Sequence, residues 1–173
     1  TKLMAHVSHK VKGVEFSTGS LGHGLPVAVG KALYFKINNK KNKVYVIISD
    51  GELNEGTTWE SIMFASHHKL ENLIALIDYN KIQSLDSVAN TLSLEPFNNK
   101  WESFGWKVFE IDGHNVPEIY DTFLNVKYQK GPVAIVANTV KGKGFSFAEN
   151  NNTWHHAPLS SSQYEAALEE LKN

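Results

Sequence analysis

Four short apolar runs, rich in β-branched side chains, recur along the chain and indicate buried strands. They cover residues 43–49, 73–78, 106–111 and 132–138. Apolar or small residues at three- and four-residue spacing predict helices over residues 26–36, 55–68, 116–129 and 162–171. Apolar strands that alternate with helices are typical of a parallel sheet covered on both faces. The pattern therefore predicts an α/β fold, a parallel sheet with helices on both faces.

The helix predicted over residues 55–68 has one face that we expect to be buried against the sheet. This face consists of Trp59, Ile62, Met63 and Ser66. Residues 84–95 lack such periodicity, and we expect a loop there. No change in composition marks a domain boundary, so we expect one domain over residues 1–173.

Composition and charge exclude several classes of function. A formal net charge of −1 gives no electrostatic basis for binding nucleic acid or an anionic membrane surface. The sequence has no cysteine, which excludes a disulfide framework and a thiolate nucleophile. No apolar run approaches the roughly 18 to 20 residues that span a bilayer. We therefore expect a cytoplasmic protein with neither a nucleic-acid nor a membrane partner.

Three glycines precede the helix predicted at residue 26. Gly19, Gly22 and Gly24 permit close approach of the backbone to a ligand, and the N-terminus of a helix favours an anion. Their spacing is not that of the dinucleotide fingerprint. Both a tight structural turn and a ligand contact are compatible with these residues.

Polar residues follow the first two predicted strands. Asp50 comes directly after residues 43–49, and Asn80 follows residues 73–78. The carboxyl ends of parallel strands meet at one edge of a sheet, where ligands bind. Carboxylate, amide and main-chain oxygens suit Mg²⁺. The alternative is that Asp50 forms a turn and Asn80 caps a helix, and the spacing alone leaves both open.

Several longer motifs resemble the transketolase family. They are GVEFSTGSLGHG at residues 13–24, DGELNEG at 50–56, VKGKG at 140–144 and WHHAPL at 154–159. Asn80 follows Asp50 by thirty residues, which resembles the pattern shared by enzymes that use thiamine diphosphate. The motifs occur in the order of the family and extend over nearly the whole chain. The resemblance implies the diphosphate-binding domain of the thiamine-diphosphate-binding fold.

The resemblance also implies how the cofactor is held. Asp50, the side chain of Asn80 and the carbonyl of Ile82 would ligate Mg²⁺, or Ca²⁺ or Mn²⁺ in its place. Gly51 and Asn80 would contact the diphosphate of thiamine diphosphate. The aminopyrimidine side of the cofactor would lie against the backbone of Gly19, Ser20 and Leu21.

Further positions match residues that act on substrate or connect subunits in the family. His155 would lie over the diphosphate and the reacting carbon, and His6 would face substrate. Glu55 and Glu60 would lie at a subunit interface. Three positions differ from the common family pattern: Ser49, His23 and His156. The last two put the identity of the substrate in doubt.

The family's activating glutamate belongs to a separate pyrimidine-binding domain, and no candidate for it follows Leu159. The family's N-terminal helices are also missing from residues 1–173. The resemblance therefore implies half of a split transketolase, active only with a pyrimidine-binding subunit or domain in a dimer or heterotetramer.

The implied reaction is transfer of a two-carbon ketol unit from a ketose to an aldose, with sugar phosphates as substrates. A related synthase with another acceptor is an alternative enzyme, and an inactive scaffold subunit is an alternative of another class. A nicotinamide-binding module is disfavoured because no G-x-G-x-x-G follows a predicted strand.

Overall fold

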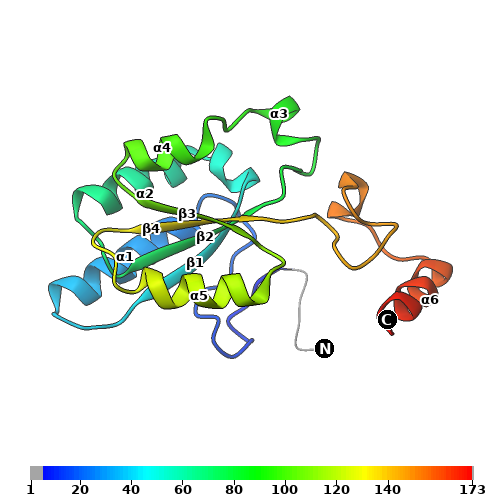
Figure 1. The fold of residues 1–173 in the computed structure, drawn as a ribbon, viewed down its shortest axis with the longest axis horizontal. Helices are drawn as coiled ribbons and strands as arrows, with labels where there is room; N and C mark the ends of the chain where they lie inside the picture. The colour runs from blue at the N-terminus through cyan, green and yellow to red at the C-terminus, as the bar shows by residue number, and fades with distance from the viewer. Residues whose placement is uncertain (1–5, 173) are drawn as a thin grey trace.

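A sheet of four parallel strands forms the centre of the computed structural model, which describes residues 6–172 (Figure 1). Its strands are β1 (Val44–Ser49), β2 (Leu73–Tyr79), β3 (Lys107–Asp112) and β4 (Val133–Asn138). They lie in the order β1-β2-β4-β3, and every neighbouring pair is parallel. The α/β fold and all four predicted strands are confirmed, with bounds that differ by one residue at most ends.

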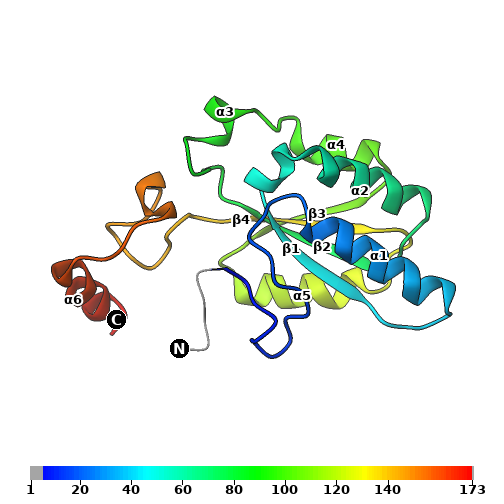
Figure 2. The same ribbon diagram turned by 180° about the vertical axis from the view of Figure 1, so that it is seen from behind.

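Helices cover both faces of the sheet, as predicted. On one face, α1 (Gly24–Ile37), α2 (Gly56–His67) and α4 (Phe97–Ser103) share the larger apolar core with the strands. On the other face, α5 (Val116–Val126) packs over a smaller core that includes Ile135 (Figures 1 and 2). In Figure 2, α1 lies alongside β1, the edge strand.

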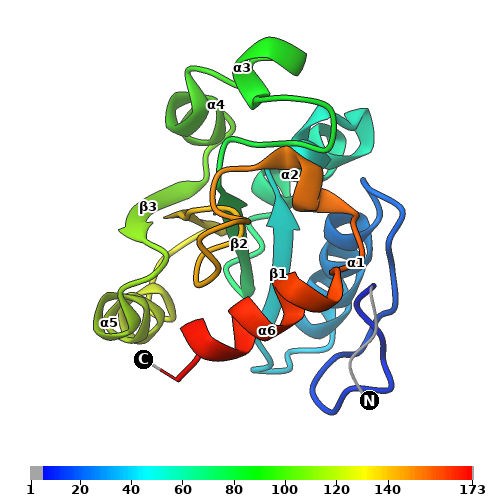
Figure 3. The same cartoon turned by 90° about the vertical axis from the view of Figure 1, so that its right-hand side faces the viewer.

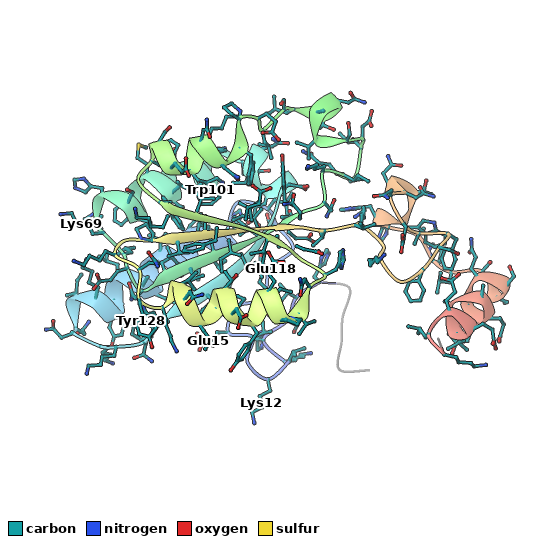
Figure 4. All side chains as sticks on the ribbon, in the orientation of Figure 1. Lys12, Glu15, Lys69, Trp101, Glu118 and Tyr128 are labelled. Atoms are coloured by element: carbon teal, nitrogen blue, oxygen red, sulfur yellow. The ribbon has the colours of Figure 1, made fainter. Side chains whose placement is uncertain are left out.

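The register of the strands brings their carboxyl ends to one level. Ser49 at the end of β1 is paired with Asp78 on β2, and Asp78 is paired with Ala137 on β4. The loops that follow β1, β2 and β4 therefore emerge side by side. Figure 4 shows Lys69 and Tyr128 at the opposite edge of the sheet.

The buried face of α2 differs from the predicted one. Met63 is 54% exposed, whereas Thr58, Ser61, Ile62 and Ala65 are buried. The hydroxyl groups can be buried because they donate to carbonyls, Thr58 Oγ1 to Glu52 O at 3.0 Å and Ser61 Oγ to Thr57 O at 2.7 Å. The prediction is confirmed for Ile62, and Trp59 is half-buried against the core. It was wrong for Met63, because hydroxyl groups that donate to carbonyls take its place on the buried face.

The segment predicted as a loop over residues 84–95 contains a short helix, α3 (Val88–Thr91). The side chain of Ser87 caps it by accepting from the backbone N–H of Asn90. The next helix, α4, was not predicted either. It buries Phe97 and Trp101 against the sheet, and Trp101 is labelled in Figure 4. The ring of Phe97 stacks on that of Tyr79, with 4.3 Å between the ring centroids.

Beyond β4 the chain continues past the carboxyl edge of the sheet, which faces the viewer in Figure 3. Here lie a 3₁₀ helix, η2 (Asn152–His155), and the last helix, α6 (Ser161–Glu170). Helix α6 begins with a capping box formed by Ser160 and Gln163. The predicted terminal helix is therefore confirmed. Among residues 6–172, no helix combines the length and the apolar character needed to cross a membrane.

Candidate functional site

Asp50 connects the loops after β1 and β2. It is only 2% exposed, and each of its carboxylate oxygens accepts a backbone hydrogen bond. The N–H of Gly51 donates to Oδ1 at 2.7 Å, and the N–H of Lys81 donates to Oδ2 at 2.7 Å. Asp50 thus caps the 3₁₀ helix η1 (Gly51–Asn54) and also reaches the Asn80 loop. The expected meeting of these two loops is confirmed.

Asn80 forms a tight turn rather than a helix cap. Its side-chain oxygen Oδ1 accepts from the backbone N–H of Ile82 at 3.0 Å, and Lys81 between them has a φ of 65°. No helix begins here, since α3 starts only at Val88. The alternative of Asn80 as a helix N-cap is therefore wrong, and Asn80 stays in the loop whose next residue, Lys81, donates to Asp50.

The electrostatics at Asp50 favour a cation. Burial raises the pKa of its carboxyl, and the backbone N–H groups of Lys81 and Gly51 counteract this rise. Nearby Asp78 raises the pKa further, whereas the charge of Lys141 lowers it. Within residues 6–172 no salt bridge joins Asp50 to a cationic side chain. A buried carboxylate in this state is stabilised by a bound cation.

The donor atoms at this edge fit a hard divalent metal ion. The carboxylate of Asp50, the amide oxygen of Asn80 and the main-chain carbonyl of Ile82, two residues further along, are all oxygen ligands, which Mg²⁺ and Ca²⁺ prefer. The part of the chain that the structure describes contains no cluster of three His, Asp or Glu side chains that could bind a metal. Any metal here would therefore be held by mixed oxygen ligands, together with oxygens of its own ligand.

Lys141 and His155 lie at the same edge of the sheet. Lys141 follows β4, and its Nζ is 3.3 Å from Nδ1 of His155 on η2. The pKa of His155 is lowered by partial burial first, and then by the charges of Lys141 and His156. A cavity of about 410 Å³ opens here, lined among others by Asn80, His114 and Lys141. The structure thus adds a cation that sequence reasoning missed, although it belongs to the motif at residues 140–144.

His6 lies directly against residues 19–24, the glycine loop. A Cβ atom at Gly19 would be 2.7 Å from Nδ1 of His6, so a side chain at this position would force the His6 ring to move. Ser20 and Leu21 continue the loop and are exposed, Leu21 by 47%. The structure therefore brings His6 to the predicted cofactor loop, while its role toward substrate stays a prediction.

The glycine loop is fastened to η1 and α2 through Gly22. The N–H of Gly22 donates to Oε1 of Glu52 at 3.0 Å, and its carbonyl accepts from Oγ1 of Thr57 at 2.8 Å. Gly22 has a φ of 77°, which favours glycine, so a tight turn does form here. Glu52 is buried, and sequence reasoning did not identify it as part of the site.

Glu55 and Glu60, predicted at a subunit interface, are both exposed near the start of α2. They do not take part in the group formed by Asp50, Lys141 and His155. Their exposure leaves them free to contact another subunit, and the interface stays a prediction.

Replacing Lys141 with methionine should raise the pKa of His155, because the charge of Lys141 favours the neutral ring. Nuclear magnetic resonance titration of the His155 ring protons would measure the change. Lys143→Met is the matched control in the same loop, since Lys143 instead lies 3.6 Å from Glu149. An equal change in both variants would contradict the local effect.

Comparisons with known proteins give matches over nearly the whole chain. The family model described as "Transketolase, thiamine diphosphate binding domain" matches residues 4–172. The chain is 44% identical over 174 residues to one subunit of the apulose-4-phosphate transketolase of Actinobacillus succinogenes. It is 42% identical over 175 residues to a 6-deoxy-6-sulfo-D-fructose transketolase subunit of a Clostridium species. These alignments cover 100% and 99% of this chain and 63% of each relative.

A solved structure is also similar. The crystal structure of transketolase from Campylobacter jejuni matches with a TM-score of 0.87 and 32% identity, over 92% of this chain and 26% of that one. The chain thus spans about a quarter of this transketolase and 63% of the two subunit relatives. The shared region is the one that contains Asp50, Asn80 and the loop after β4.

Proposed function

The chain belongs to the family of transketolase thiamine-diphosphate-binding domains, and we propose that it holds this cofactor through a divalent metal ion as part of a ketol-transferring enzyme. The observation that carries the proposal is the hydrogen bond from the N–H of Lys81 to the buried carboxylate of Asp50. It fixes the two loops that provide oxygen ligands. Residues 1–173 then form one diphosphate-binding domain.

In this proposal each loop at the carboxyl edge has a separate task. Asp50, the amide oxygen of Asn80 and the carbonyl of Ile82 hold Mg²⁺, or Ca²⁺ or Mn²⁺ in its place. Gly51, Asn80 and Lys141 contact the diphosphate, Lys141 by its charge. The backbone of Gly19, Ser20 and Leu21 lies along the aminopyrimidine ring.

The reaction proposed is transfer of a two-carbon ketol unit from a ketose to an aldose. When bound, thiamine diphosphate supplies the nucleophilic carbon that breaks and forms the carbon–carbon bond. His155 contacts the oxygen of the substrate on which charge develops and stabilises that charge. Its lowered pKa keeps the ring neutral near neutral pH, so that it donates one hydrogen bond without adding a positive charge. His6 faces the substrate beside Gly19.

Relatives suggest the partner and the kind of substrate. Two are named as subunits, of transketolases for apulose 4-phosphate and for 6-deoxy-6-sulfo-D-fructose. We therefore propose a pyrimidine-binding partner subunit that meets Glu55 and Glu60, in a dimer or heterotetramer. Substrates would be sugars that carry a phosphate or another strongly acidic group. A cytoplasmic location stays a prediction from the sequence.

The first test is the melting temperature of the protein with added ligands. Thiamine diphosphate should raise it only when Mg²⁺ is present, because the metal joins the diphosphate to Asp50. A ligand at one hundred times its Kd stabilises the folded state by about 2.7 kcal/mol. NAD is the control and should have no effect. Stabilisation by NAD, or by neither cofactor, would contradict the proposal.

The second test is activity with and without a partner. We expect no ketol transfer by this polypeptide alone with thiamine diphosphate and Mg²⁺, and turnover when a pyrimidine-binding subunit is added. Glu55 and Glu60 cannot supply the activating carboxylate, because they lie just after Asp50 at the start of α2. In this proposal that end of the site holds the diphosphate and not the aminopyrimidine ring. Robust turnover without a partner, in a preparation free of other transketolases, would refute the half-site proposal. Persistent inactivity with the partner, despite cofactor binding, would favour a scaffold subunit.

A further inference from the structure

The peptide of Gly22 is held on both sides by the segment that follows Asp50. Its N–H donates to Oε1 of Glu52 at 3.0 Å, and its carbonyl accepts from Thr57 Oγ1 at 2.8 Å. Both partners lie within seven residues of Asp50 in the sequence, whereas Gly22 is thirty residues before Glu52. The glycine loop is therefore attached through one residue, Gly22, by two hydrogen bonds to the segment 50–57. We call this segment, which begins with the candidate metal ligand Asp50, the metal loop.

Glu52 is enclosed by this attachment. It is 7% exposed, and burial raises the pKa of its carboxyl, while the backbone N–H groups of Gly22 and Gly24 lower it. Gly24 is the first residue of α1, so the carboxylate lies at the positive end of this helix. The backbone N–H of Glu52 donates to Ser49 Oγ at 3.2 Å, at the end of β1. Glu52 therefore joins β1, the glycine loop and the start of α1.

The contact at Gly22 leaves no space for a side chain. A Cβ atom there would be 2.5 Å from Thr57 Oγ1 and 2.8 Å from Glu55 Cβ. The backbone of the loop thus rests directly on the start of α2. A small change in this contact would move Gly19, Ser20 and Leu21 relative to Asp50.

We propose that Glu52 is a positioning residue that holds the glycine loop at a fixed distance from the metal loop, so that one cofactor reaches both. This rests on the proposed function, in which the diphosphate binds near Asp50 and the ring lies along Gly19, Ser20 and Leu21. Glu52 does not touch the cofactor. It joins the two loops into one rigid unit through Gly22.

If so, a change at Glu52 should affect ligands that span both loops and ligands that occupy one loop differently. Removing the carboxylate of Glu52 releases the N–H of Gly22 and leaves the two hydrogen bonds of Asp50 intact. A ligand that occupies only the metal loop should then bind as before. A ligand that spans both loops should lose affinity.

The test compares two probes on the whole protein in complex with its partner. Thiamine diphosphate with Mg²⁺ spans both loops, and inorganic pyrophosphate with Mg²⁺ occupies the metal loop alone. In Glu52→Ala, we expect thiamine diphosphate to bind about 10- to 100-fold more weakly, the effect of one hydrogen bond to a charged group. Pyrophosphate should bind within about twofold of the wild type, since its contacts are unchanged. Calorimetry measures both affinities.

Matched variants separate positioning from a general loss of structure. Glu52→Gln keeps an acceptor oxygen of the same size and should restore most of the affinity for thiamine diphosphate. Glu102→Ala removes an exposed carboxylate from α4 and should leave both affinities unchanged. If Glu52→Ala does not fold, Thr57→Val tests the second hydrogen bond and should weaken thiamine diphosphate binding alone, by about 3- to 10-fold.

Amide hydrogen exchange measures, without any ligand, whether Glu52 restrains the glycine loop. Amides of residues 20–25 should exchange faster in Glu52→Ala, while those of residues 80–83 should not. Equal losses of affinity for both probes, no loss for either, or unchanged exchange at residues 20–25 would overturn the proposal. If the wild type binds neither probe, the proposed function fails, whereas the exchange result still decides whether Glu52 holds the loop.

Discussion

Replacing Asp50 with alanine should abolish binding of thiamine diphosphate at concentrations that saturate the wild type. Asp50 is the one charged side chain among the proposed metal ligands, and it joins the loops after β1 and β2. Loss of a mere hydrogen-bond partner of a metal ligand already costs about 10- to 100-fold in metal affinity. We therefore expect at least about 100-fold weaker cofactor binding in titration calorimetry of the assembled enzyme.

Control variants must distinguish the loss of a metal-binding side chain from the loss of the folded structure. Asp50→Ala leaves the half-buried N–H groups of Gly51 and Lys81 without their acceptor, at a cost of at most about 1–3 kcal/mol each. Asp50→Asn keeps one acceptor oxygen without the charge and should also lose the cofactor. Asp121→Ala removes an exposed carboxylate from α5 and should bind normally. Unchanged cofactor affinity in a folded Asp50→Ala protein would rule out the metal assignment.

The meeting of Asp50 with the Asn80 loop could be predicted because it follows from topology. Two apolar runs identify neighbouring parallel strands, and each polar residue comes directly after one of them. No side-chain detail is needed for that inference. The same reasoning predicted the helices on both faces, since α5 presents a regular apolar stripe to the sheet.

Residues outside such regular patterns were missed. Glu52 and Gly22 are thirty positions apart and meet only through the packing of α1 and α2 on β1. Lys141 is a lysine in a glycine-rich loop, and its position beside His155 depends on the path of the chain after β4. These contacts are between loops, where periodicity carries no information. Helix α4 was missed because its seven residues are too few to show a period.

Replacing His155 with alanine should reduce kcat by about 100- to 1,000-fold, the usual cost of removing one donor that stabilises developing charge. His155 lies on η2 at the carboxyl edge of the sheet, 3.3 Å from the ammonium group of Lys141. Cofactor affinity should fall much less, because the ligands at Asp50 remain. Stopped-flow or steady-state assays of the assembled enzyme, normalised to the folded fraction, measure this difference.

The pH profile gives a second reading of His155, independent of the size of the loss. Its pKa is lowered by partial burial, Lys141 and His156, so the neutral ring persists at pH values where an ordinary histidine is charged. Activity of the wild type should fall only below that lowered pKa, and His155→Ala should lack this decline. Lys141→Met should shift the decline to higher pH, since the charge of Lys141 no longer opposes protonation.

His156→Ala is the neighbouring control for His155→Ala and should keep most of the turnover. If His155→Ala loses thermal stability while turnover per folded enzyme is unchanged, His155 is structural and does not act on substrate.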